Sequence, residues 1–228
     1  MNKGYLHLGR WRGAPIRIHW TTPLGAIVFS GFEIAPGLWL GFLLLVLIHE
    51  LGHATVVRLC RQRVVSVDIH GLGGVCRWHG EVTPIRRASI AWGGVWAQML
   101  LLAATLLWKT FAGAPSGVFI ADLVRAFVQT NVMLMGLNLM PIAPLDGAEA
   151  WALPGLLLGR WRRARALRRA GRRRAALRAE IATLETLDEE GAVVTPEVVD
   201  VLERAREIAR REAGSSRRLP VGRDEDEG

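Results

Sequence analysis

The sequence is poor in cysteine. Only two of its 228 residues are cysteines, Cys60 and Cys76, and this pair provides neither a disulfide framework nor the CxxC spacing of a metal site. We therefore expect both to be ordinary thiols. The N-terminus also has no convincing small-residue cleavage site after its first apolar stretch, so we expect that stretch to be retained.

Hydrophobic residues are abundant instead. They make up 50% of the chain, and the mean hydropathy is +0.22, which places membrane proteins ahead of ordinary soluble domains. A helix of about 20 apolar residues crosses the hydrocarbon of a bilayer. Four segments are candidate spans, covering residues 16–32, 36–60, 88–111 and 118–140. The apolar stretch up to Leu158 is too short for another crossing, and we expect it to lie along or dip into the membrane boundary.

Positive charge is unevenly distributed. The formal net charge of +8 would suit a nucleic-acid-binding protein, but the arginines flank apolar segments or gather in residues 160–174. The turns on the opposite side hold only Glu33, Lys109 and Asp122. By the positive-inside rule, we expect an integral protein of the cell (inner) membrane, with both termini and the ends of the second and fourth spans facing the cytoplasm.

Residues 61–83 have a different pattern. Val65, Val67 and Ile69 alternate with polar residues and are followed by glycines, which predicts a strand and a hairpin. The fold class is therefore an all-α polytopic membrane protein of about four transmembrane helices, with a small β-hairpin insertion and a cytosolic helical tail. We expect a membrane core at 1–159, an arginine-rich helical hairpin at 160–213 and a disordered tail at 214–228.

The second span ends in the pentapeptide His49-Glu50-Leu51-Gly52-His53. Residues four apart lie on the same face of a helix, so His49 and His53 can bind one Zn²⁺ while Glu50 lies beside the metal. This HExxH pattern also occurs by chance on soluble helices. Histidine and glutamate are costly at membrane depth, however, which favours a functional role here.

Catalytic zinc has three protein ligands and one open position. Asp146 is the candidate for the third, because it follows the fourth span in the run Asn138-Leu-Met-Pro-Ile-Ala-Pro-Leu-Asp146-Gly147. Two crossings separate the second and fourth spans, so their C-terminal ends meet on the same side of the membrane. The alternative is a loop aspartate that caps the turn before Gly147.

Together, HELGH on an apolar helix and NLMPIAPLDG near the end of a later one resemble the site-2 protease family of intramembrane zinc metalloproteases. The resemblance covers roughly the first two-thirds of the chain, including PIRIHW and HGLGG. It implies that His49, His53 and Asp146 bind one zinc ion per chain, that Glu50 is the general acid/base, and that Asn138 assists near the reacting carbonyl.

The resemblance also implies the substrate, which is a membrane protein with a transmembrane segment cleaved by regulated intramembrane proteolysis. A helix hides its peptide bonds in internal hydrogen bonds, so it must unwind before attack. One interpretation of residues 64–70 is an exposed edge with which such an extended segment pairs. A structural hairpin is the equally weighted alternative.

Other functions stay open. An inactive relative that binds membrane helices would have lost a ligand or the general base, and all four of these residues are present: His49, Glu50, His53 and Asp146. An adaptor that acts through its tail would hold a purely structural metal.

For the arginine cluster we expect the lipid bilayer rather than nucleic acid as the partner, and the tail helices could join copies of the chain or bind a regulator. We expect the tryptophans, including Trp92, to anchor at the membrane interface.

Overall fold

The computed structural model describes residues 4–113, 115–189, 200, 203–204 and 207. The chain divides into two units, Met1–Leu158 and Gly159–Gly228. Most of the predicted second tail helix and all of the predicted disordered tail at 214–228 lie outside the described residues. The long helix α7, Ala152–Glu189, is continuous through the predicted boundary at residue 159.

The first unit contains a four-stranded sheet. Its strands are β1 (Tyr5–Trp11), β2 (Ala14–His19), β3 (Arg63–His70) and β4 (Gly73–His79), in that spatial order. The predicted hairpin is present as the antiparallel pair β3–β4, but it is only half of the sheet, because β2 pairs with β3 in parallel. The hairpin insertion is thus enlarged to a sheet by two N-terminal strands.

A buried charge cluster joins the strands of this sheet. The Asp68 carboxylate, with 1% of the residue exposed, accepts hydrogen bonds from Arg17 Nε at 2.6 Å and Nη2 at 2.7 Å. Ser66 Oγ lies 3.1 Å from the same carboxylate, and Arg77 Nε lies 3.2 Å away. Because Arg17, Asp68 and Arg77 come from three neighbouring strands, the cluster ties β2, β3 and β4 together.

The first predicted span, residues 16–32, is not a transmembrane helix. It consists of the end of β2 and the eight-residue helix α1, Thr22–Phe29, which at 1.5 Å per residue is far too short to cross a bilayer alone. Ile16 and Ile18 alternate with Arg17 and His19, and this period of two suits a strand.

The β2–α1 segment nevertheless runs along most of the neighbouring helix α2, Pro36–Leu59. At one end, Arg58 Nη2 donates to the backbone oxygen of Arg12 at 2.6 Å. At the other, Trp39 Nε1 donates to Ser30 Oγ at 3.3 Å. Arg12 lies in the turn before β2 and Ser30 directly follows α1, so the flanks of this segment bond to opposite ends of α2.

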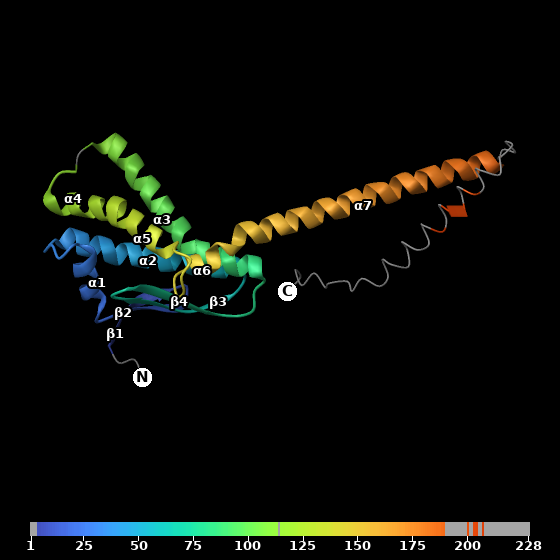
Figure 1. Cartoon of the computed structure of the whole chain (residues 1–228). Coiled ribbons are helices and arrows are strands. Elements are labelled where there is room, and N and C mark those ends of the chain that lie inside the picture. Colours follow the sequence, from blue (N-terminus) through green and yellow to red (C-terminus); the bar gives the residue numbers. More distant parts are fainter. Residues whose placement is uncertain (1–3, 114, 190–199, 201–202, 205–206, 208–228) are drawn as a thin grey trace. The chain divides into compact units, whose positions relative to one another are not determined.

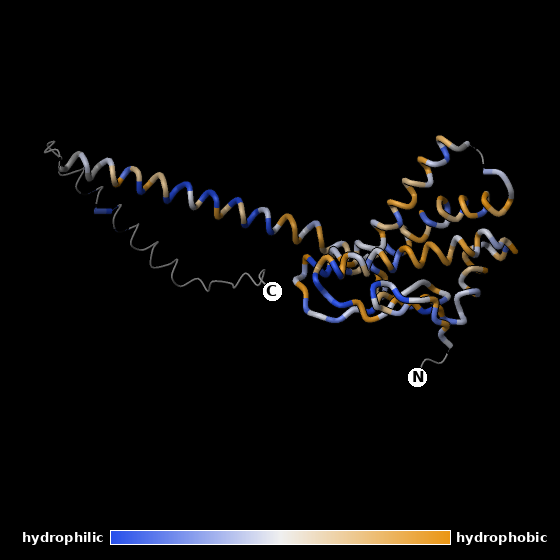
Figure 2. Tube along the Cα trace, turned by 180° about the vertical axis from the view of Figure 1, so that it is seen from behind, coloured by the Kyte–Doolittle hydropathy of each residue, from blue (hydrophilic) through white to orange (hydrophobic). Residues whose placement is uncertain are grey.

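Three helical segments among the described residues are long and apolar enough to span a membrane, namely Pro36–Leu59, Pro84–Phe111 and Val118–Asn138. The second lies in α3 (Pro84–Ala112), and the third comprises α4 (Val118–Arg125), the π-helix η1 (Ala126–Thr130) and α5 (Asn131–Asn138). The predicted count of four is therefore not confirmed. The hydrophobic colouring of these helices in Figure 2 agrees with an integral membrane protein.

Helix α2 lies at the centre of this unit. It contacts α3, α4 and η1 on one side and strands β3 and β4 on the other (Figure 1). Glycines permit the close approach between α2 and α3, because a Cβ on Gly52 would overlap the backbone oxygen of Gly93, and one on Gly93 would lie 2.8 Å from that of Gly52. Small residues give this kind of close packing in membranes, where water drives no association.

Candidate metal centre

Helix α2 carries the HExxH residues in its C-terminal half. His49, Glu50 and His53 are buried, with 5%, 3% and 6% of each residue exposed. The helix begins at Pro36, whose missing N–H costs nothing at that position, and its apolar first half packs into the core around Phe42 and Leu45. The packed helix thereby places three polar side chains in the interior.

Asp146 approaches these residues from a separate segment, between α5 and the short helix α6, Gly147–Ala150. Two indole N–H groups hold this segment: Trp151 Nε1 donates to the Leu139 oxygen at 2.7 Å, and Trp92 Nε1 of α3 donates to the Ala150 oxygen at 2.9 Å. Gly147 is required next to Asp146, since a Cβ there would overlap the backbone oxygens of Leu139 and Met140.

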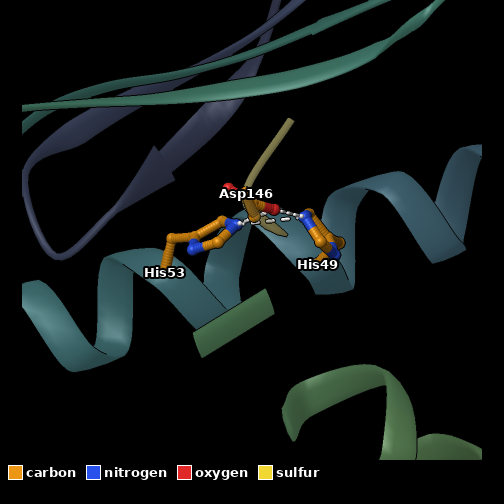
Figure 3. A group of neighbouring side chains, drawn as sticks. All are labelled: His49, His53 and Asp146. Carbon is orange, nitrogen blue, oxygen red and sulfur yellow. Dashed lines mark hydrogen bonds and ion pairs between the residues drawn. The ribbon is translucent and has the colours of Figure 1, made fainter. Parts of the chain in front are cut away.

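The donor atoms of the three predicted ligands meet at one point (Figure 3). Asp146 Oδ2 lies 2.9 Å from His49 Nε2 and 3.1 Å from His53 Nε2, and the two Nε2 atoms are 3.0 Å apart. In a tetrahedral zinc site with bonds of about 2.0–2.1 Å, ligand atoms lie about 3.3 Å apart. The group therefore has the size and the donor types of a site that could hold a metal ion.

The outer nitrogens of both imidazoles already have protein partners. His53 Nδ1 lies 2.7 Å from the Ile90 backbone oxygen, and His49 Nδ1 lies 2.9 Å from Gln98 Oε1. Both partners are acceptors, so each Nδ1 carries the hydrogen and each Nε2 presents a lone pair. Two such nitrogens and a carboxylate oxygen within about 3 Å repel one another unless a proton or a cation lies among them, which suits a divalent metal.

The charge state of Asp146 favours cation binding as well. Burial acts to raise the pKa of Asp146, but the positive charge at its contacts with His49 and His53, which is that of a shared proton when no metal ion is bound, outweighs burial and holds that pKa below its ordinary value. The carboxylate is therefore ionised at neutral pH.

Glu50 points from α2 toward the sheet. A Cβ on Gly74 of β4 would lie 2.6 Å from Glu50 Oε1 and would overlap the Glu50 side chain, so β4 passes directly over this carboxylate. On the α3 side, a Cβ on Gly94 would lie 2.6 Å from His49 Nδ1. Two glycines from different elements thus make room for the HExxH side chains.

Asn138, the last residue of α5, is also adjacent to the cluster. Its Nδ2 lies 3.4 Å from His49 Nε2. The structure thus brings together all five residues singled out in the sequence: His49, Glu50, His53, Asn138 and Asp146.

The outer partners of the cluster were missed in the sequence. The motifs did not indicate Gln98. Trp92 was predicted to anchor at the membrane interface, whereas its indole N–H donates to the Ala150 oxygen in the segment that carries Asp146. A signal existed for Gln98, because an uncharged polar residue inside a candidate span often forms a hydrogen bond between helices. No comparable signal distinguishes Trp92 from the other tryptophans.

The prediction that residues 64–70 form an exposed edge for the substrate is wrong over residues 67–69. Strand β3 is paired with β2 at Val67, Asp68 and Ile69 and with β4 along its other side, so it has no free edge over that stretch. The outer strand next to Glu50 is β4.

Comparisons with known proteins agree with this geometry. No family model matches the chain. A Mycobacterium tuberculosis protein named as a zinc metalloprotease, Rip3, is 33% identical over 163 residues, which cover 62% of this chain and 41% of that protein; the same match occurs in two strains. The chain thus spans about two fifths of the length of these curated relatives.

A solved structure shows the same fold. The site-2 protease from Methanocaldococcus jannaschii aligns with a TM-score of 0.50 and 20% identity, over 90% of this chain and 95% of that one. The fold and the site define a membrane-embedded helical protein with a His-His-Asp centre. The match to the zinc metalloprotease and the shared fold agree with the resemblance found in the motifs: the chain is similar in sequence to a protein named as a zinc metalloprotease and similar in fold to a site-2 protease.

Proposed function

We propose that this protein is an intramembrane zinc metalloprotease, which hydrolyses peptide bonds within or next to transmembrane segments of other membrane proteins. The observation that carries the proposal is the convergence of two imidazole nitrogens and one carboxylate oxygen within 3.1 Å, beside a buried glutamate, in a unit built of apolar helices. Buried ionisable groups at membrane depth are expensive and are typical of functional sites.

In this proposal His49, His53 and Asp146 hold one zinc ion per chain. A bound zinc ion supplies Lewis acidity, which polarises a carbonyl and makes water a better nucleophile near neutral pH. Glu50 accepts the proton of the attacking water and returns it to the leaving amine. The Asn138 amide, which lies at the same cluster, donates a hydrogen bond to the oxygen of the carbonyl under attack.

The substrate segment would bind in an extended form along β4. A transmembrane helix has to unwind before its peptide bonds are accessible, and its freed N–H and C=O groups then need partners in a medium without water. The outer edge of a sheet offers such partners. Strand β4 is favoured over β3 because it is the outer strand and lies over Glu50.

For orientation, we propose that the end of α2 that carries the metal centre faces the cytoplasm, in the cell (inner) membrane. Support comes from the arginines near this end, which include Arg58, Arg61 and Arg63, and from the arginine-rich α7 that follows the membrane unit. Arg58 bonds to the Arg12 oxygen in the turn between β1 and β2, so this turn lies at the same end of α2 as Arg58. Both termini would then be cytoplasmic.

The test is cleavage of a panel of transmembrane substrates by purified wild type and Glu50→Gln. Glu50→Gln keeps the shape of the side chain but removes the base, so we expect cleavage to fall about 10²–10⁴-fold while bound zinc stays at the wild-type level. Cleavage by Glu50→Gln at the wild-type rate would contradict the proposal. Zinc bound by wild type with no cleavage of any substrate would favour an adaptor with a structural metal.

A further inference from the structure

The side chain of Gln98 contacts the metal centre from a different helix. Gln98 lies in α3 with 1% of the residue exposed, and its Oε1 is 2.9 Å from His49 Nδ1. An amide oxygen can only accept a hydrogen bond, so His49 must carry its hydrogen on Nδ1. The lone pair is then on Nε2, the nitrogen that lies beside Asp146.

The two histidines are held in different ways. His53 Nδ1 donates to the backbone oxygen of Ile90, a partner that no side-chain substitution removes. His49 relies on a side chain. The chain therefore provides an internal comparison, in which the outer hydrogen bond of His49 can be altered while that of His53 is left intact.

Gln98 is itself held from the third span. Asn131 is fully buried, and its Nδ2 donates to the Gln98 backbone oxygen at 3.0 Å and to the Phe127 oxygen at 3.2 Å. Asn131 directly follows the π-helix η1, where the looser helical turn frees carbonyl groups from the regular ladder. A hydrogen-bond chain thus runs from the third span through α3 to His49 in α2.

We propose that Gln98 is a positioning residue, which fixes the tautomer and ring orientation of His49 and thereby sets how tightly the centre retains zinc. The inference rests on the proposed function. Outer partners of metal-binding histidines typically contribute 10–100-fold to metal affinity. Loss of Gln98 should have an effect of that size without removing any ligand.

The experiment measures the rate of zinc release to a chelator from the zinc-loaded, full-length protein in detergent. Gln98→Met has a similar length but no strong acceptor, and we expect it to release zinc about 10–100-fold faster. Gln98→Glu restores an acceptor for Nδ1–H and should return the rate to within about threefold of wild type. Thr105→Val is the matched control, because Thr105 is also a buried polar residue of α3, and its hydroxyl donates to the Leu101 oxygen within its own helix.

A second measurement covers the case in which Gln98→Met does not fold. The ¹⁵N spectrum of the histidine rings in the zinc-loaded wild type should show hydrogen on Nδ1 of His49. Hydrogen exchange at this site should be slow, since the group is buried and bonded. An exposed, rapidly exchanging His49 Nδ1–H would overturn the proposal.

The outcomes separate the two proposals. If wild type retains zinc and Gln98→Met releases it at the wild-type rate, the role of Gln98 is wrong and the proposed function stands. If Gln98→Glu is as defective as Gln98→Met, the effect of Gln98 is one of packing, and the positioning role is wrong. If metal-replete wild type holds no zinc, both proposals fail.

Discussion

The metal centre and helix α7 differ in the burial and the bonding of their polar residues. At the metal centre, the imidazoles of His49 and His53 are buried, the Asp146 carboxylate is partly buried, and each meets a specific partner on another element. In α7 the arginines of residues 160–178, which belong to the second unit, are all exposed. Since a buried polar group is costly to leave without its partner, single substitutions should have large effects in the first region and small effects in the second.

The largest effect on stability is expected in the buried charge cluster of the sheet. Asp68→Asn removes the negative charge that Arg17 and Arg77 face, and breaking a buried ion pair costs about 3–5 kcal/mol. Because Arg17 retains some exposure to solvent, we expect about 3 kcal/mol. Thermal unfolding in detergent measures it, with the exposed ion pair variant Glu149→Gln as the control. An unchanged unfolding temperature would show that this cluster does not hold the sheet together.

Gly147→Ala should act next, through the segment that carries Asp146. The added Cβ would overlap two backbone oxygens, so the segment must move, at a cost of about 1–3 kcal/mol. We expect zinc to be released about tenfold faster or more. Gly136→Ala, where a Cβ meets nothing within 4 Å, is the matched control. Equal zinc release by the two variants would contradict the account of this turn.

Trp92→Phe should have a smaller effect. It keeps the aromatic ring near Trp151 but removes the hydrogen bond to the Ala150 oxygen, which is worth about 1 kcal/mol. Zinc release should quicken by about fivefold. The control is Trp108→Phe, in the exposed last part of α3. If both tryptophan variants behave alike, membrane anchoring explains Trp92 after all.

The smallest effect is expected in α7. Arg172, Arg173 and Arg174 are exposed, so changing all three to glutamine should alter the unfolding free energy of the membrane unit by less than about 0.5 kcal/mol. Zinc release should be unchanged. A large change in either quantity would break the contrast between the two regions and would mean that α7 supports the metal centre.

The local part of the site could be predicted from the sequence. The HExxH spacing places two imidazoles on the same face of a helix, and the order of the apolar segments indicated that Asp146 would approach that face. These inferences need only helical periodicity and the side of the membrane on which each segment ends. The hairpin at β3–β4 followed in the same way from the alternation of valine and isoleucine with polar residues.

The rest depends on contacts between distant elements. Residues 16–32 have the composition of a span, and only a few alternating residues around Arg17 indicated a strand, too few to decide between the two periods. The Gln98–His49 and Trp92–Ala150 bonds join residues 49 and 58 positions apart. Such bonds depend on how closely the helices approach, which here is set by glycines such as Gly52 and Gly93. Helical periodicity alone does not define that distance.

The most direct test of the central claim is the zinc content of the purified, metal-replete protein, compared between wild type and His49→Ala by mass spectrometry. We predict close to one zinc ion per chain in wild type and its loss in His49→Ala, with the exposed-histidine variant His79→Ala as the control. Wild type without zinc, or His49→Ala with the same zinc content as wild type, would contradict the proposed metal centre.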